Sequence, residues 1–271
     1  MAKKKNIKTQ DVSIEEMDYI DYKMNPDSDK WKTYEPKNYV SYDYTIKFKC
    51  KNEKQKDFYN LLKDDSKVIS AALGSPGSGK SYVSLAYALQ ALKSGKYKRI
   101  ICFVPTAPAG ASALQIGYLK GTLEDKIQPF YQADKETLTK ILEQSGNSQA
   151  EKIVDGLLRN NILQYRLLNF VRGQSIDDAL MLLNEVENYN LQELILIMTR
   201  IGYNSKLCLT GDILQCDRSD IKKSGKGNSG IEQVVGRLSD MDEFGMVTFG
   251  KDDIVRNPII SKILDRLVPE S

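Results

Sequence analysis

Short apolar runs, separated by stretches long enough for a helix, recur along the chain from residue 66 onward. The runs occupy residues 68–73, 100–104, 162–168, 180–183, 207–209 and 246–249. Two of the intervening segments, 80–92 and 191–201, carry apolar residues three and four positions apart, which is the spacing of an amphipathic helix. Alternating apolar strands and helices are typical of a mainly parallel sheet with helices on both faces. The pattern therefore predicts an α/β fold.

The first part of the chain has a different pattern. Residues 1–41 are rich in lysines and acidic groups and show no apolar period, so we expect a partly irregular N-terminal extension. From residue 42 to residue 50 apolar and polar side chains alternate, which predicts a half-buried strand. We therefore expect residues 42–271 to form one folded domain.

Composition narrows the possible chemistry. The chain has 271 residues, of which 41% are apolar and 28% charged, and it contains no histidine. These proportions are those of an ordinary globular protein. The absence of histidine excludes Ser-His and Cys-His catalysis and almost every catalytic zinc arrangement. A net charge of +3 is too small to argue by itself for nucleic acid.

The four cysteines and the lack of long apolar segments bear on location. Cys50, Cys102, Cys208 and Cys216 form no Cys-x-x-Cys pair, so we expect free thiols in a reducing cytoplasm. The chain starts without the apolar stretch of a secretory signal. No segment approaches the ~18 apolar residues of a membrane span. The sequence thus predicts a cytoplasmic protein with no membrane partner.

A glycine-rich segment lies between the first apolar run and the first predicted helix. It reads Gly74-Ser75-Pro76-Gly77-Ser78-Gly79-Lys80-Ser81 and matches the phosphate-binding pattern G-x-x-x-x-G-K-[ST]. Gly77 and Gly79 allow positive φ angles, which turn backbone N–H groups inward around an anion. Lys80 can then reach the β and γ phosphates of a nucleotide, while the Ser81 hydroxyl binds Mg²⁺. A glycine-rich turn that binds nothing is the alternative, and the eight matching positions disfavour it.

Polar residues follow two later apolar runs. Asn184 and Glu185 come after run 180–183, and Asp212 comes after run 207–209, with Gln215 three residues further on. Ligands of open α/β sheets gather at the carboxyl ends of the strands, so these groups are expected near the phosphate-binding loop. Each alone is as readily a surface or turn residue. As a set at successive strand ends they favour a nucleotide site.

Ordered blocks of residues resemble the motifs of the PhoH family, the phosphate-starvation-inducible proteins. In chain order the blocks are Gln55, 74–81, 116–130, 172–175, 184–188, 196–202, 210–215 and 253–258. The resemblance covers roughly residues 52–268. It implies a RecA-like P-loop NTPase similar to the first motor domain of superfamily 1 helicases. It further implies Mg²⁺-dependent ATP hydrolysis, RNA-directed, helicase-like activity and a ring-shaped, hexameric assembly.

The resemblance also implies roles for individual residues around the nucleotide. Gln55 would lie near the adenine, and residues 77–81 would bind the phosphates and Mg²⁺. Glu185 would orient or activate the attacking water. Asp212 and Gln215 would sense the γ-phosphate.

Three arginines could stabilise transition-state charge in such a protein. Arg256 is the first candidate on the resemblance, and Arg200 and Arg172 follow. In a ring, each could be offered to the nucleotide of a neighbouring subunit. For each of them the alternative is a surface ion pair, which contributes little to stability.

One departure from the family motif affects the expected metal site, which comprises Ser81, Asn184 and Glu185. Where the family has Asp-Glu-Ala-Gln-Asn, this chain has Asn-Glu-Val-Glu-Asn at 184–188. Asn184 keeps an acceptor oxygen but loses a charge that, at ~5 Å from Mg²⁺, is worth on the order of 6 kcal/mol before desolvation is subtracted. Asp212 or Glu187 could compensate. We expect Asn184→Asp to tighten Mg²⁺-ATP binding and raise turnover.

Three functions remain open at this stage. The first is Mg²⁺-dependent ATP hydrolysis coupled to RNA or single-stranded nucleic acid, for which Lys222, Lys223 and Lys226 are candidate phosphate contacts. The second is a nucleotide-binding assembly module with weak or no turnover, motivated by Asn184. The third is a small-molecule phosphotransferase, which leaves Gln215 and the helicase-like blocks unexplained. The compact architecture favours a virus, such as a phage, as the source.

Overall fold

The structure is a computed structural model that describes residues 44–104, 123–168, 171, 173, 175–212, 229–256, 259 and 266; for residues 123–130 it describes the backbone alone. The predicted N-terminal extension, 1–41, lies outside the described residues. The boundary at residue 42 therefore stays a prediction.

The described strands form one parallel sheet of six, in the order β3-β2-β4-β5-β1-β6. Their bounds are β1 Ile69–Gly74, β2 Arg99–Val104, β3 Leu163–Leu167, β4 Ala179–Leu183, β5 Lys206–Gly211 and β6 Phe244–Phe249. Each strand coincides with one of the predicted apolar runs. In the register, Leu73 pairs with Gly211, and Gly74 pairs with Phe249. The carboxyl ends of the three strands β5, β1 and β6 thus lie side by side.

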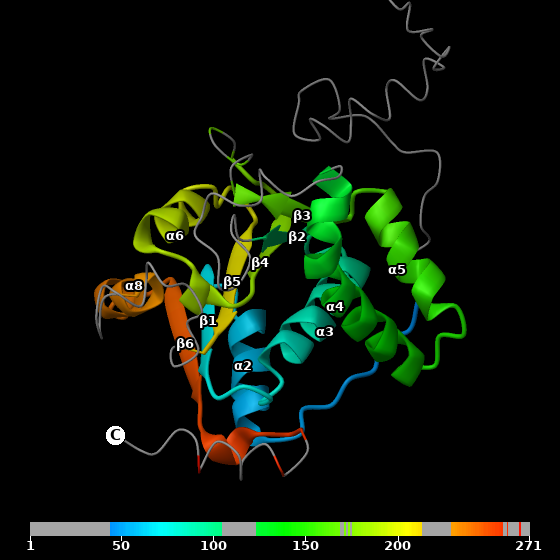
Figure 1. Cartoon of the computed structure of the whole chain (residues 1–271), viewed down its shortest axis with the longest axis horizontal. Coiled ribbons are helices and arrows are strands. Elements are labelled where there is room, and N and C mark those ends of the chain that lie inside the picture. The colour runs from blue at the N-terminus through cyan, green and yellow to red at the C-terminus, as the bar shows by residue number, and fades with distance from the viewer. Residues whose placement is uncertain are drawn as a thin grey trace, which may run out of the picture. The chain divides into compact units, whose positions relative to one another are not determined.

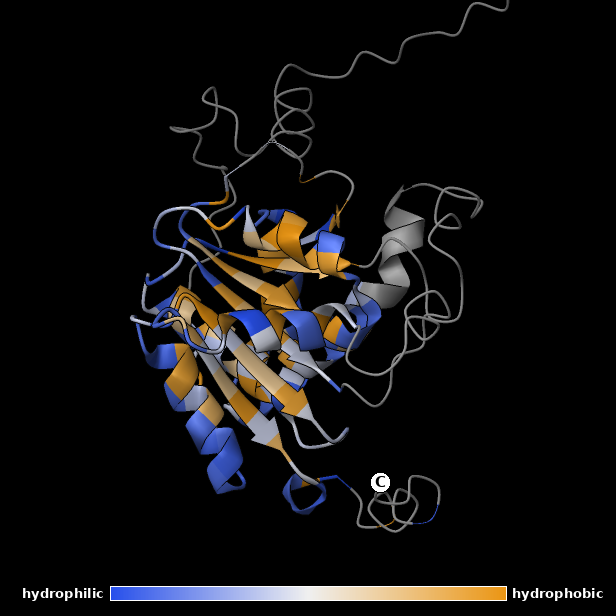
Figure 2. Cartoon of the chain, turned by 90° about the vertical axis from the view of Figure 1, so that its left-hand side faces the viewer, coloured by the Kyte–Doolittle hydropathy of each residue, from blue (hydrophilic) through white to orange (hydrophobic). Residues whose placement is uncertain are grey.

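Helices cover both faces of this sheet (Figure 1). One face carries α2 Glu53–Lys63, α3 Lys80–Lys93, α4 Leu123–Gln144 and α5 Ala150–Arg159; the other carries α6 Leu191–Met198, α8 Gly230–Leu238 and the short 3-10 helix η4 Val186–Asn188. Successive strand residues face opposite cores, so that Leu182 packs with the first group of helices and Leu183 with the second. Figure 2 shows the strands as predominantly hydrophobic. The predicted α/β fold, a mainly parallel sheet with helices on both faces, is confirmed.

The two helices predicted from periodicity are present. Helix α3 agrees with the predicted 80–92. Helix α6 ends at Met198, before the predicted end at residue 201. Thr199 is the C-cap of the helix, and Ile201 pairs with Ile176 in a parallel bridge.

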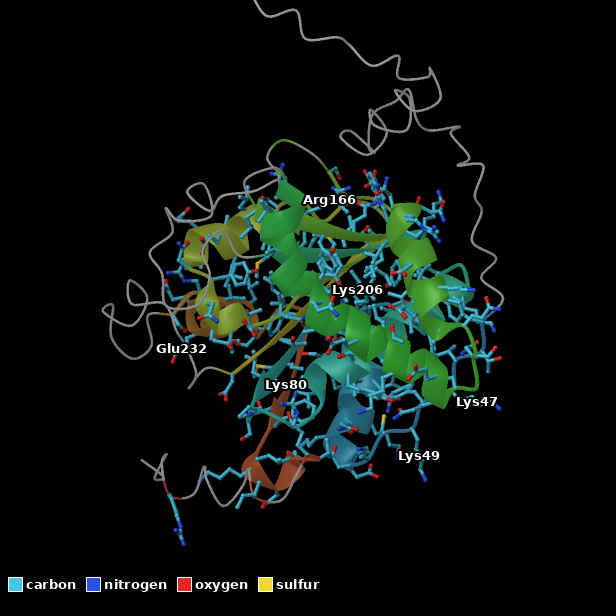
Figure 3. The ribbon with its side chains drawn as sticks, turned by 45° about the vertical axis from the view of Figure 1, so that its right-hand side comes forward. Lys47, Lys49, Lys80, Arg166, Lys206 and Glu232 are labelled. Carbon is cyan, nitrogen blue, oxygen red and sulfur yellow. The ribbon has the colours of Figure 1, made fainter. Side chains whose placement is uncertain are left out.

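The predicted strand at residues 42–50 is wrong. Residues 44–50 are extended but belong to no strand, and their backbone bonds to side chains that follow α4. Asn147 binds both the N–H and the carbonyl of Thr45 (2.9 and 2.7 Å), and the Ser145 hydroxyl does the same for Lys47 (2.8 and 2.9 Å). The alternation itself is real: Tyr44 is buried, whereas Lys47 and Lys49 are exposed (Figure 3). Alternation reports an extended chain on an apolar surface and does not identify its hydrogen-bonding partner.

A buried lysine holds the end of helix α2. Lys206, the first residue of β5, donates from Nζ to the carbonyl oxygens of Leu61, Leu62 and Asp64 at 3.3, 2.8 and 2.6 Å. The last carbonyls of a helix lack partners within the helix, and a cation is favourable beside them. Lys206 thereby fixes α2 against the amino end of the sheet.

The described cysteines are free thiols, as predicted. Cys102 and Cys208 are buried and Cys50 is half-buried; Cys216 lies outside the described residues. Burial raises the pKa of Cys208 to about 12, which makes it unreactive near neutral pH. In the part of the chain that the structure describes, no helix is long and apolar enough to cross a bilayer.

Candidate nucleotide-binding site

The glycine-rich loop connects the carboxyl end of β1 to the start of α3. Its three glycines adopt positive φ angles, +122° at Gly74, +76° at Gly77 and +87° at Gly79. A Cβ atom on Gly74 would lie 2.0 Å from the carbonyl oxygen of Phe249, so a side chain cannot be accommodated there. This left-handed backbone, followed at once by a helix N-terminus, is the geometry predicted for an anion-binding nest.

Lys80 lies inside the loop (Figure 3). Its ammonium donates to the carbonyl oxygens of Gly74 (2.7 Å) and Ser75 (2.8 Å) and to the Ser78 hydroxyl (3.3 Å). Only 8% of the residue is exposed, and this burial lowers its pKa. A nearby anion would favour the charged ammonium and oppose that effect. The neighbouring Ser81 is exposed in the first turn of α3.

Gln55 contacts the loop from the first turn of α2. Its Nε2 donates to the carbonyl oxygen of Ser78 at 2.8 Å, and its Oε1 accepts from the Lys51 N–H at 2.8 Å. The residue is 3% exposed. The structure therefore places Gln55 against the phosphate-binding loop, and the predicted contact with adenine stays a prediction.

Arg256 reaches the loop from the segment that follows β6 and the 3-10 helix η6, Lys251–Asp253. The Val255 N–H donates to the carbonyl oxygen of Gly77 at 3.1 Å. The aliphatic stem of Arg256 crosses Gly77, because a Cβ there would lie 3.2 Å from its Cδ. The guanidinium contributes to lowering the pKa of Lys80. The structure thus brings the stem of Arg256 to the loop of its own chain, and its role in stabilising transition-state charge stays a prediction.

Asn184 follows β4 at the same edge of the sheet, and both ends of its amide are engaged. Its Oδ1 accepts from the Thr210 hydroxyl at 2.7 Å, and its Nδ2 donates to Oδ1 of Asp134 at 3.5 Å. The other carboxylate oxygen of Asp134 accepts from the Tyr165 hydroxyl at 3.3 Å. Burial raises the pKa of Asp134 to about 6.

The sequence interpretation missed Asp134. This residue lies on α4, and only the fold brings it to the end of β4. A signal was present: Asp134 is four and seven residues before the fully buried Leu138 and Ile141, so it occupies the inward face of its helix. An acidic residue in phase with a buried stripe is a candidate for a site.

Glu187 and Asp212 are hydrogen-bonded to each other near Lys80. Oε2 of Glu187 accepts from the Asp212 N–H at 2.9 Å, and a Cβ on Gly211 would lie 2.1 Å from that oxygen. Both residues are buried, and both contribute to raising the pKa of Lys80 against the effect of its burial. Burial in turn raises the pKa of Glu187 to about 7. The two carboxyl groups and the loop ammonium thus form one electrostatic cluster.

Glu185 is exposed at the rim and has a φ of +54°. The left-handed region is unfavourable for a residue with a side chain, and such strain persists where the surroundings impose it. Glu185 immediately precedes η4, whose first residue, Val186, is buried.

Arg200 is not brought to this site. Its carbonyl accepts from Ile176 N–H at 2.8 Å, and Ile176 precedes β4 at the amino end of the sheet, opposite the loop. Its guanidinium donates to the Thr199 hydroxyl at 3.1 Å. Gln215 and Arg172 lie outside the described residues, as do the candidate lysines 222, 223 and 226.

Comparisons with known proteins give a family match for most of the chain. A family model described as PhoH-like protein matches residues 47–267. The chain is 30% identical over 211 residues to a PhoH-like protein of Bacillus subtilis, covering 78% of this chain and 61% of that protein. It is 28% identical over 218 residues to Protein PhoH of Escherichia coli, covering 79% and 56%. The chain therefore spans a little over half the length of these relatives.

A solved structure with a similar chain is the Sulfolobus solfataricus SWI2/SNF2 ATPase core in complex with dsDNA. The TM-score is 0.40 at 13% sequence identity, with 77% of this chain and 46% of that chain covered.

Proposed function

This chain belongs to the PhoH-like protein family, and we propose that it binds ATP with Mg²⁺, hydrolyses it, and couples hydrolysis to RNA or single-stranded nucleic acid. The observation that carries the proposal is the loop itself, with three left-handed glycines and the Lys80 ammonium held on the Gly74 and Ser75 carbonyls. Phosphoryl transfer depends mainly on positioning and charge stabilisation, which such a loop can supply without histidine.

The triphosphate would bind over the loop. Its oxygens would accept from the inward backbone N–H groups and from the start of α3. Lys80 would exchange its two carbonyl partners for phosphate oxygens. Because burial disfavours the charged lysine, an anionic phosphate would stabilise it and bind more tightly than at an exposed lysine.

Mg²⁺ would be bound by Ser81, Asn184 and Glu185, whose oxygen atoms are ligands of the type that this ion prefers. The geometry of Asn184 fits this role. An amide oxygen has two acceptor sites, and the Thr210 hydroxyl uses one of them. The ion would neutralise charge on the phosphates when bound.

The remaining residues would act on the γ-phosphate and on water. Glu185, exposed at the rim, would orient or activate the attacking water. Arg256 would stabilise the developing charge, a role supported by its position across Gly77. Asp212 and Gln215 would sense the γ-phosphate.

We extend the proposal to the assembly: copies of this chain would form a ring, hexameric as the family resemblance implies, that acts on nucleic acid. Arg200 would then act on a neighbouring subunit's nucleotide, because its backbone lies at the amino end of the sheet, away from the loop of its own chain. An assembly module with weak or no turnover is the second candidate, favoured by the amide at Asn184 in place of a carboxylate.

An ATPase assay with and without RNA separates these functions. We expect Mg²⁺-dependent turnover that RNA stimulates, abolished by Lys80→Ala because nucleotide binding is lost. Glu185→Gln should keep binding and lose turnover. Binding by the natural chain without turnover would support the assembly module instead. Turnover that requires a small acceptor molecule would support a phosphotransferase.

A further inference from the structure

We infer that Asp134 supplies the negative charge that faces Mg²⁺ in this chain, acting through Asn184 as a positioning residue. The inference rests on the proposed function, since it concerns the Mg²⁺ of the same nucleotide site. It addresses one departure from the family motif, an amide at 184 where the motif has a carboxylate. Asp134 would supply the charge from α4 instead of from the end of β4.

The first argument is contact. Asp134 Oδ1 lies 3.5 Å from Asn184 Nδ2, so the carboxylate lies directly behind the amide at the end of β4. The Thr210 hydroxyl donates to the other end of the amide, at 2.7 Å. These two contacts fix which end of Asn184 is nitrogen and which is oxygen.

The second argument is polarisation. A carboxylate that accepts from an amide N–H increases the negative charge on the carbonyl oxygen of the same amide, because hydrogen bonds in a chain strengthen one another. Asn184 Oδ1 thereby becomes a better ligand than an amide oxygen without such a partner. Carboxylates that orient and polarise a metal ligand in this way are a common feature of metal sites.

The third argument is the charge of the groups that contact Asp134. Within the described part of the chain its hydrogen-bonding partners, Asn184 and Tyr165, are both neutral. Asp134 is half-buried on the inward face of α4, where a carboxylate with neutral partners is stabilised by a nearby positive charge. Mg²⁺ at Asn184 would provide it.

Glu187 is less suited to this role. Its carboxylate accepts the Asp212 N–H at 2.9 Å and is thereby held at the end of β5. Its negative charge already acts on Lys80, because Glu187 and Asp212 both raise the pKa of that lysine.

The test is a Mg²⁺ titration of nucleotide binding, followed by the fluorescence of a mant-ATP analogue. Asp134→Asn removes the charge and keeps the shape, and we expect Mg²⁺ to bind roughly 10- to 100-fold more weakly. Binding of the analogue without Mg²⁺ should change by no more than about 2-fold. Asp57→Asn, at an exposed position on α2, removes the same charge and should leave both affinities within about 2-fold.

A relocated charge supplies the decisive variant. Asp134→Asn combined with Asn184→Asp places the carboxylate where the family motif has it, and should restore Mg²⁺ affinity to at least that of the natural chain. Asn184→Asp should therefore improve Mg²⁺ binding more in the Asp134→Asn background than in the natural chain. Where Asp134→Asn alone is unstable, the Mg²⁺ affinity of the double variant is compared directly with that of the natural chain and of Asn184→Asp.

Two failures are distinguishable. If the natural chain binds the analogue without any Mg²⁺ dependence, the proposed function and the inference are both overturned. If its binding depends on Mg²⁺ but Asp134→Asn titrates like the Asp57→Asn control, the inference alone is overturned.

Discussion

The side chain of Gln55 donates a hydrogen bond of 2.8 Å to the carbonyl oxygen of Ser78. This contact joins the start of α2 to the phosphate-binding loop, although the two residues are 23 positions apart. Both residues are buried, so neither group can turn to water instead.

Gln55→Ala should therefore destabilise the protein and loosen the loop. A buried carbonyl left without its donor costs about 1–3 kcal/mol, and we expect a loss of this size in the free energy of unfolding measured with urea. Nucleotide affinity should fall as well, because the loop is no longer held in its binding geometry. Gln132→Ala, at an exposed position on α4, is the matched control and should change neither quantity by more than about 0.5 kcal/mol. Equal effects of the two substitutions would contradict this role.

Gly79→Ala should be more damaging to binding than a glycine substitution elsewhere. Gly79 has a φ of +87°, and an added Cβ would lie 2.6 Å from Gln55 Nε2. Gly95→Ala is the matched control, because Gly95 has a φ of +72° with nothing within 4 Å of the added Cβ. Both variants should lose about 1–2 kcal/mol of stability from the left-handed backbone alone. Only Gly79→Ala should also lose nucleotide binding, measured by calorimetry. Intact binding in that variant would contradict the assignment of the loop as the nucleotide-binding site.

The success of the sequence interpretation depended on how local each signal was. The loop is encoded by eight consecutive residues, and the central strands β1, β4 and β5 are buried on both faces, so each is readable from its own segment. Asp134 and Asn184 are 50 residues apart, and no local pattern indicates that α4 reaches the end of β4. The motif order suggested Arg200 as a site residue, yet α6 returns the chain to the opposite edge of the sheet. Periodicity and motifs thus locate elements, whereas packing between helices and strand ends decides which side chains meet.

The buried Lys206 should make stability depend on pH in an unusual direction. Burial lowers its folded-state pKa from 10.5 to about 8, so folding disfavours the protonated form. The free-energy cost of burying the protonated lysine is fully present below pH 8 and is absent above pH 10.5. The free energy of unfolding therefore increases with pH between these two values. The full effect is at most about 3 kcal/mol.

Comparison with Lys206→Met isolates this group from the other lysines and tyrosines that titrate in the same range. The free energy of unfolding of the natural chain, minus that of the variant, should rise between pH 8 and pH 10.5. Urea unfolding at a series of pH values measures it, and a difference that is constant or falls with pH would contradict the prediction.

Glu185 should lower the stability of the protein while contributing to ATP hydrolysis. An exposed residue with a φ of +54° pays for a left-handed backbone, and glycine adopts that conformation without the clash of a Cβ atom. Glu185→Gly should consequently be more stable than Glu185→Ala by about 1–2 kcal/mol, since the two variants lack the same side chain and differ in the backbone strain. Both should lose ATP hydrolysis if Glu185 handles the water, while nucleotide binding at the Lys80 loop persists. Thermal unfolding of the two variants tests the backbone strain, and equal stabilities would show that Glu185 is not strained. Single-turnover hydrolysis tests the chemistry, and undiminished hydrolysis would show that Glu185 does not take part in the reaction.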